Sequence, residues 1–197
     1  VAAFTSWNFP VVLAARKIAP ALAAGCSVIL RPAEEAPGSA MSLVQCLHEA
    51  GVPAGVINLI NGSADTISPV LLNESRVRKI SLTGSARVGK LLIKASAETL
   101  KRTSMELGGH APVIIYADAD AEAIAEQAAL VKFKHCGQVC ASPSRYFIHE
   151  SQAESFTNKF IEIAQNFKLG NGMESGIDIG PLATKKRLKE VELMVSG

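Results

Sequence analysis

Short apolar segments alternate with longer helical patterns along the first half of the sequence. The strand candidates are Val1–Thr5, Cys26–Leu30, Gly55–Leu59 and Lys79–Thr83. The helix candidates that separate them are Val11–Ala24, Ser39–Ala50, Thr66–Asn73 and Ala86–Ala97. Brief strands rich in Val, Ile and Leu are typical of strands buried on both faces, so this rhythm predicts an α/β fold with a parallel sheet between two helical layers. Ligands of such sheets bind beyond the carboxyl ends of the strands.

The second half of the sequence repeats the alternation after a pair of glycines. Its expected elements are a strand Pro112–Tyr116, a helix Ala121–Lys134, a strand Arg145–His149 and a helix Gln152–Phe167, followed by a surface loop Gly170–Gly180. We interpret Gly108-Gly109 as a hinge, because glycine accepts backbone conformations that other residues avoid. The sequence therefore predicts two domains, over residues 1–107 and 108–197.

Composition excludes several classes of function. A net charge of +2 and an aromatic content of 5% argue against a nucleic-acid partner. No apolar run reaches the length of a membrane span, and no signal peptide is recognisable, so we expect no membrane partner and a cytoplasmic location. Four cysteines without a secretion signal are expected to be free thiols. The chain begins at Val1 inside a strand-like segment, which we interpret as the internal part of a longer protein.

Four segments carry residues suited to chemistry, and each has a structural alternative. Cys140 follows a turn that contains glycine, but most free cysteines are small buried hydrophobic residues. Glu106 ends a strand next to two glycines, where the alternative is a solvated strand end. Asn8 lies between a strand and a helix, where an amide can stabilise an oxyanion or cap the helix. The segment Gly84–Gly89 opens a helix and can either hold a phosphate or form a tight turn.

Taken together, in their order along the chain, these segments resemble the aldehyde dehydrogenase superfamily. The matching motifs are Trp7-Asn8-Phe9-Pro10, Arg31-Pro32-Ala33-Glu34-Glu35, Gly51-Val52-Pro53-Ala54-Gly55-Val56, Thr83-Gly84-Ser85, Glu106-Leu107-Gly108-Gly109 and Gly137-Gln138-Val139-Cys140. The resemblance implies a Rossmann-like cofactor domain, lacking its beginning, followed by the first part of a second α/β catalytic domain. It also implies oxidation of a small aldehyde to a carboxylic acid by an NAD(P)-dependent homodimer or homotetramer.

The resemblance assigns a role to each motif. Cys140 is the expected nucleophile, Glu106 the general base and Asn8 the oxyanion donor. The expected cofactor contacts are Trp7, Arg31, Glu34, Gly62, Gly84, Ser85 and Leu107. Glu34 favours NAD because a carboxylate beside the adenosine ribose repels a 2′-phosphate. Arg31 replaces the lysine usual in the family. Because a guanidinium can bind a phosphate, NADP remains an alternative cofactor.

The sequences of these motifs are most similar to those of the succinate-semialdehyde branch of the family. We therefore expect succinic semialdehyde as the substrate. Ser142 occupies the position where many members of the branch carry a second cysteine, so Cys136 is the remaining candidate for a redox partner of Cys140. Two other functions stay open. One is an inactive, truncated cofactor-binding remnant, and the other is a cysteine hydrolase that pairs Cys140 with His135, His110 or His149. No metal is expected, because His135, Cys136 and Cys140 lack a second ligand pair.

Overall fold

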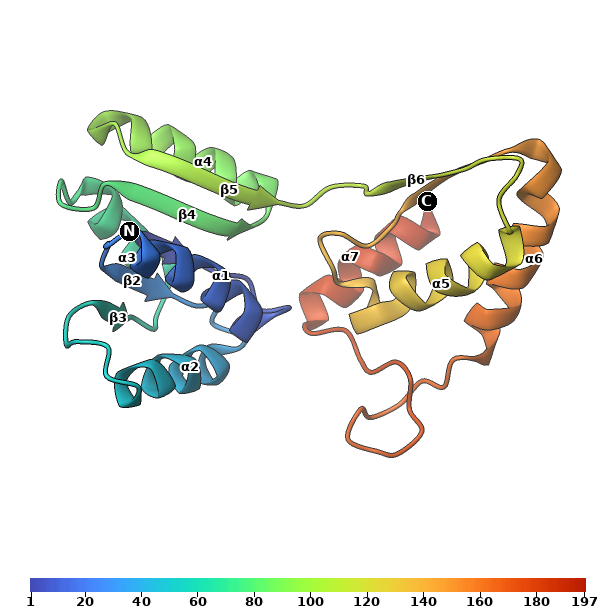
Figure 1. Ribbon diagram of the computed structural model, residues 1–197, viewed down its shortest axis with the longest axis horizontal. Coiled ribbons are helices and arrows are strands. Elements are labelled where there is room, and N and C mark those ends of the chain that lie inside the picture. The colour runs from blue at the N-terminus through green and yellow to red at the C-terminus, as the bar shows by residue number, and fades with distance from the viewer. The chain divides into compact units, whose positions relative to one another are not determined.

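The structure, a computed structural model, describes residues 1–197 as two compact units. Unit 1 is Val1–Gly108 and unit 2 is Gly109–Gly197, so the division falls inside the Gly108-Gly109 pair. The predicted α/β class with a parallel sheet is confirmed (Figure 1). None of the helices combines the length and the apolar character that a membrane span requires.

Unit 1 contains a parallel sheet of five strands in the order β3-β2-β1-β4-β5. The strands are β1 (Ala2–Phe4), β2 (Val28–Arg31), β3 (Ile57–Leu59), β4 (Lys79–Gly84) and β5 (Arg102–Leu107). The chain first builds the sheet outward from β1 to β3 and then returns to add β4 and β5 on the other side of β1. This reversal creates a topological switch point between β1 and β4, which is where open α/β sheets bind their ligands.

Helices cover both faces of this sheet (Figure 1). They are α1 (Pro10–Ala23), α2 (Pro37–Glu49), α3 (Ala64–Asn73) and α4 (Ala86–Ser96), with a short 3₁₀ turn η1 (Ala97–Thr99). On one face, Ala3 and Leu30 pack against α1 and α2. On the other face, Phe4 and Ile80 pack against α3 and α4, because successive side chains of a strand point to opposite faces.

Several elements begin at residues that the sequence pattern did not indicate. The helices α1 and α2 start at Pro10 and Pro37, because proline lacks an N–H and suits the first helical position. The helix α3 starts at Ala64, two residues earlier than expected, because the Ser63 hydroxyl accepts a hydrogen bond from the backbone N–H of Asp65. The expected strand Gly55–Leu59 begins only at Ile57, because the N–H of Val56 closes a turn onto the Pro53 carbonyl.

Unit 2 is built on two parallel strands, β6 and β7, which pair from Pro112 with Arg145 to Ile115 with Ile148. Its elements are β6 (Pro112–Ile115), α5 (Ala121–Phe133), η2 (Lys134–Gly137), β7 (Arg145–Ile148), α6 (Glu150–Asn166) and α7 (Lys185–Ser196). The helices α5 and α6 bury one face of the strand pair around Ile115, Ala125 and Phe156. The opposite face exposes apolar side chains, since Ile114 is 63% exposed and Phe147 is 54% exposed.

Candidate active site

The residues expected to bind the cofactor follow the carboxyl ends of the strands of unit 1. Trp7 and Asn8 follow β1, Glu34 follows β2, and Gly62 follows β3. Gly84 ends β4 beside Leu107, which ends β5, and Ser85 comes next in the chain. Because the strands are parallel, these ends meet at one edge of the sheet, the edge at which such sheets bind ligands.

Asn8 does not cap helix α1. The N-cap position belongs to Phe9, the first helical residue is Pro10, and no side chain forms a cap hydrogen bond. The helix-cap interpretation of Asn8 is therefore wrong. The half-buried amide lies in the loop that leaves the central strand β1, which is compatible with a role toward a ligand.

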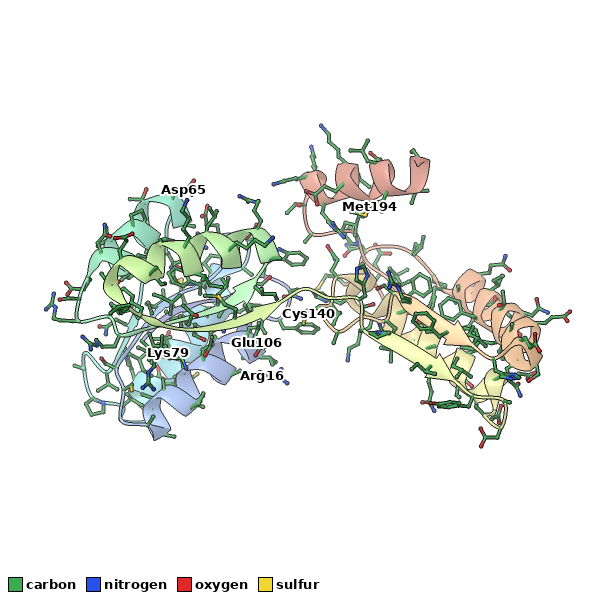
Figure 2. All side chains as sticks on the ribbon, turned by 90° about the horizontal axis from the view of Figure 1, so that it is seen from above. Arg16, Asp65, Lys79, Glu106, Cys140 and Met194 are labelled. Carbon is green, nitrogen blue, oxygen red and sulfur yellow. The ribbon has the colours of Figure 1, made fainter.

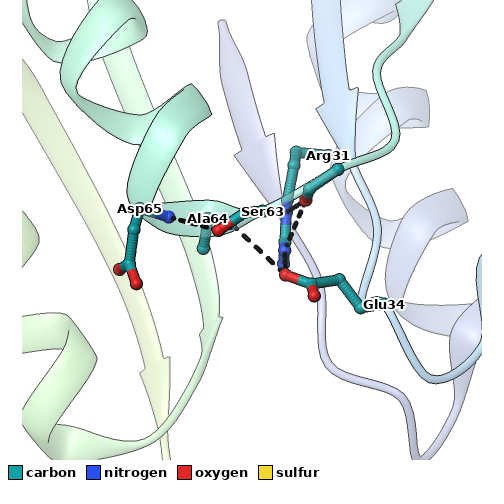
Figure 3. Close-up of polar contacts among 6 residues, drawn as sticks. Arg31, Glu34, Ser63, Ala64 and Asp65 are labelled. Carbon is teal, nitrogen blue, oxygen red and sulfur yellow. Dashed lines mark hydrogen bonds and ion pairs between the residues drawn. The ribbon is translucent and has the colours of Figure 1, made fainter.

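Arg31 and Glu34 form one network at the carboxyl end of β2 (Figure 3). The buried guanidinium of Arg31 donates hydrogen bonds to the carbonyl oxygen of Gly62, at 3.2 Å from Nε and 2.8 Å from Nη2. It also forms an ion pair with the Glu34 carboxylate, which accepts a hydrogen bond from the backbone N–H of Ala64 at 3.3 Å. Arg31 therefore ties β2 to the loop after β3, while the Glu34 side chain remains 58% exposed.

The N-terminus of α4 has the character of an anion site. The hydroxyl of Ser85 caps the helix by accepting a hydrogen bond from the N–H of Val88 at 3.3 Å. The first turn contains no acidic residue, so no carboxylate neutralises the positive end of the helix dipole. A Cβ atom on Gly89 would lie 2.9 Å from Cδ2 of Leu107, so glycine allows α4 to pack closely against β5.

Glu106 lies exposed at the end of β5, paired in register with Thr83 (Figure 2). The buried side chain of Lys17, from helix α1, donates a hydrogen bond from Nζ to Oγ of Ser81 at 3.1 Å. Burial lowers the pKa of Lys17 to about 8, and the Glu106 carboxylate opposes this shift, while the charge of Lys79 adds to it. Lys17 is thus a buried cation in the electrostatic field of Glu106.

Sequence reasoning missed Lys17, although a signal for it exists. Lysine occupies a position on the apolar stripe of α1, whose buried residues are Leu13, Ala14, Lys17, Ile18 and Ala21. A lysine at a position on the core-facing stripe of a helix predicts a buried charge. Proteins keep a buried charge only when other groups stabilise it.

The pKa of Lys17 predicts a pH dependence of stability. Because its pKa is lower in the folded chain than in the unfolded chain, burial destabilises the fold below pH 8, and this penalty disappears as the pH rises toward 10.5. The free energy of unfolding, compared with that of a Lys17→Met variant, should rise by about 1–2 kcal/mol over this range after allowance for screening by solvent. Urea unfolding of both proteins at several pH values measures the difference, and a constant difference would contradict the shift.

Cys140 belongs to unit 2, in the loop between η2 and β7 (Figure 2). All four cysteines are free, as expected, and Cys140 is exposed, so the interpretation of Cys140 as a buried structural thiol does not hold. The structure contains no group of three or more His, Cys, Asp or Glu side chains arranged to hold a metal ion.

Two of the histidines considered as partners of Cys140 have other partners. His110 lies with Nδ1 3.3 Å from the hydroxyl of Ser144, and the same hydroxyl donates to the His110 carbonyl at 2.7 Å. The ring of His149 caps α6 and lies 2.9 Å from the hydroxyl of Ser151. These contacts give the cysteine-hydrolase alternative no support.

Comparisons with known proteins agree on one family. Residues 1–197 match the sequence model of the family described as "Aldehyde dehydrogenase family". The chain is 47% identical to the 3-sulfolactaldehyde dehydrogenase of Pseudomonas putida and 43% identical to the succinate semialdehyde dehydrogenase of Acinetobacter baylyi, over 99% and 98% of its length. An NADP-dependent enzyme of E. coli has a similar structure, with a TM-score of 0.96 and 39% identity over 100% of the chain. The chain spans 40% of the length of both relatives and 41% of that structure.

Proposed function

The chain belongs to the aldehyde dehydrogenase family, and from this premise we propose that it is part of an enzyme that oxidises an aldehyde to a carboxylic acid with a nicotinamide dinucleotide. The observation that carries the proposal is the collection of Asn8, Glu34, Ser85 and Glu106 beyond the carboxyl ends of neighbouring parallel strands. Open parallel sheets bind dinucleotides at this edge, which supports the proposal.

In the proposed reaction, the thiolate of Cys140 attacks the aldehyde carbonyl and forms a thiohemiacetal. The Asn8 amide and the Cys140 backbone N–H donate hydrogen bonds to the developing oxyanion. When bound, a nicotinamide would supply the hydride acceptor for oxidation of this adduct to a thioester of Cys140. Glu106 takes a proton from water, which hydrolyses the resulting thioester and releases the acid and the Cys140 thiol.

The geometry of unit 1 fits a dinucleotide. The N-terminus of α4 offers backbone N–H groups and a first turn without acidic residues to a pyrophosphate. The exposed carboxylate of Glu34, held by Arg31, offers hydrogen-bond acceptors to ribose hydroxyls. Trp7, Gly62 and Leu107 complete the proposed contact set from neighbouring strand ends.

We propose a preference for NAD over NADP, because the Glu34 carboxylate repels a 2′-phosphate and Arg31 is already engaged by Gly62 and Glu34. A Glu34→Gln variant should lower the ratio of kcat/KM for NAD to that for NADP about tenfold, since it removes the repulsion and releases the guanidinium. Steady-state kinetics with both cofactors measure this ratio. Glu35→Gln, which removes an exposed neighbouring carboxylate, is the matched control and should leave the ratio unchanged. An unchanged ratio in the Glu34 variant would remove Glu34 from the cofactor site.

The substrate we propose is an aldehyde that carries an acidic group, with succinic semialdehyde as the first candidate. The names of the two relatives support this class, since one acts on 3-sulfolactaldehyde and the other on succinate semialdehyde. We further propose that the full-length protein assembles as a homodimer or homotetramer, which rests on family membership alone.

A panel of aldehydes, assayed with NAD and NADP on the full-length polypeptide, tests the proposed function. Acidic aldehydes should be oxidised with a higher kcat/KM than uncharged aldehydes of equal length. Reduction of neither cofactor by any aldehyde would instead favour a remnant that only binds the cofactor. Sedimentation of the same protein tests the oligomeric state.

A further inference from the structure

The turn that leads into Cys140 has an uncommon backbone conformation. His135, Cys136 and Gly137 have φ angles of 55°, 58° and 71°, all in the left-handed region. Only glycine adopts this region without a steric cost, and two of the three residues are not glycine. Such a conformation persists only where surrounding contacts hold it, and conformations of this kind concentrate at functional sites.

The contacts that hold this turn come from a segment far along the chain. The thiol of Cys136 donates to the carbonyl oxygen of Gly180 at 3.0 Å, across 44 residues of sequence, and lies 3.5 Å from the carbonyl oxygen of Pro181. On the other side of the turn, the backbone N–H of Ala183 donates to Oε1 of Gln138 at 3.2 Å. Residues 180–183 therefore contact the turn on both sides of Gly137.

The same turn is closed internally by hydrogen bonds to the His135 carbonyl. Both the backbone N–H of Gln138 and its side-chain Nε2 donate to this oxygen, at 3.1 Å and 3.2 Å. Gln138 thus uses its amide nitrogen to close the turn and its amide oxygen to bind Ala183. Cys136 adds a second side-chain attachment of the turn to residues 180–183, through the contacts of its thiol with the Gly180 and Pro181 carbonyl oxygens.

The protonation state of the Cys136 thiol suits a hydrogen-bond donor. Burial raises the pKa of this thiol. The group therefore stays protonated near neutral pH, and the S–H group can donate to a carbonyl oxygen, which a thiolate cannot do. This state is the opposite of what a thiolate nucleophile or a resolving thiol requires.

We propose that Cys136 is a positioning residue, whose S–H hydrogen bond to the Gly180 carbonyl holds the left-handed turn that presents Cys140. The proposal rests on the proposed function in one respect, the identity of Cys140 as the nucleophile. It assigns a role to residues 180–183, which the reaction itself does not use.

The test compares Cys136→Ala, which removes the donor, with Cys136→Ser, which keeps a donor, in the full-length protein. The exposed thiol of Cys46 on α2 provides the matched control, Cys46→Ala, because it removes a cysteine far from this turn in the sequence. Hydrogen–deuterium exchange reports on the turn without any need for activity, and kcat and KM for the aldehyde and the cofactor report on catalysis.

In Cys136→Ala, amide exchange should rise at residues 135–142 and at residues 180–183 together. The kcat value should fall about fivefold to tenfold, the effect of losing one hydrogen bond that orients a reacting group, with little change in the KM for the cofactor. Cys136→Ser should restore most of the slow amide exchange in both segments and most of kcat, and Cys46→Ala should match the wild type.

Wild-type exchange in both segments of Cys136→Ala would overturn the proposal, as would a serine variant that is as impaired as the alanine variant. A rise in exchange without any fall in kcat would also overturn it, because the turn would then be irrelevant to Cys140. If the wild-type protein oxidises no aldehyde, the proposed function fails, and exchange still decides whether Cys136 holds the turn.

Discussion

Replacing Cys140 with alanine is expected to lower aldehyde oxidation by the full-length enzyme at least about a thousandfold. The expectation follows from the covalent mechanism, in which no thiohemiacetal and no thioester can form without this sulfur. Cofactor affinity should remain within about twofold of the wild type, because the proposed contacts with the dinucleotide all lie in unit 1. Initial rates of cofactor reduction and the dissociation constant of the cofactor measure the two effects.

The control for this experiment is Cys26→Ala, which removes another exposed thiol and should retain wild-type rates. Alkylation adds an independent check, because the loss of activity with iodoacetamide should follow the modification of Cys140 and not that of the exposed thiols Cys26 and Cys46, as peptide mass spectrometry can show. A Cys140→Ala variant that retains a tenth or more of the wild-type rate would refute the assignment of the nucleophile.

Replacing Glu106 with glutamine is expected to separate the two halves of the reaction. The amide cannot accept a proton from water, so thioester hydrolysis should slow by about a hundredfold to ten-thousandfold. Attack by Cys140 and oxidation of the adduct do not need this base in the proposed scheme. A rapid burst of about one reduced cofactor per active site should therefore precede the slow steady state.

Stopped-flow measurements of cofactor reduction resolve the burst from the steady state. Hydroxylamine, a nucleophile that cleaves thioesters without a general base, should restore turnover to the variant. Glu98→Gln in η1 removes an exposed carboxylate outside the site and should behave as the wild type. Full steady-state turnover of Glu106→Gln would show that another group activates water.

The sheet and its helices were predictable because their signals are local. Apolar strands such as Val28–Arg31 alternate with helices that bury one stripe, and both patterns can be read from neighbouring residues. The order of the strands was not predictable in this way, because the position of β4 beside β1 depends on contacts between residues about 80 positions apart, such as Ala2 and Ile80. Local patterns contain no information about such pairings.

The same distinction applies to the candidate site. The motif predicts roles for Arg31 and Glu34, but the hydrogen bonds from Arg31 to Gly62 join the end of β2 to the loop after β3, a pairing that local sequence does not indicate. Lys17 was missed because a lysine in a helix usually reaches water. The sequence predicts Cys136 only as a partner of Cys140, because its contact with Gly180 joins residues 44 positions apart and depends on the fold of the segment between them.

The close packing of Gly89 against Leu107 has a consequence for directed evolution of this enzyme. Leu107 directly follows Glu106, and Gly89 lies in the helix whose N-terminus we assign to the pyrophosphate. Because a Cβ atom at position 89 would lie 2.9 Å from Cδ2 of Leu107, a larger residue there requires the Leu107 side chain to move, directly beside Glu106, the proposed base. Libraries aimed at a new cofactor should therefore randomise positions 89 and 107 together, because the size of the residue at one position limits the size that fits at the other.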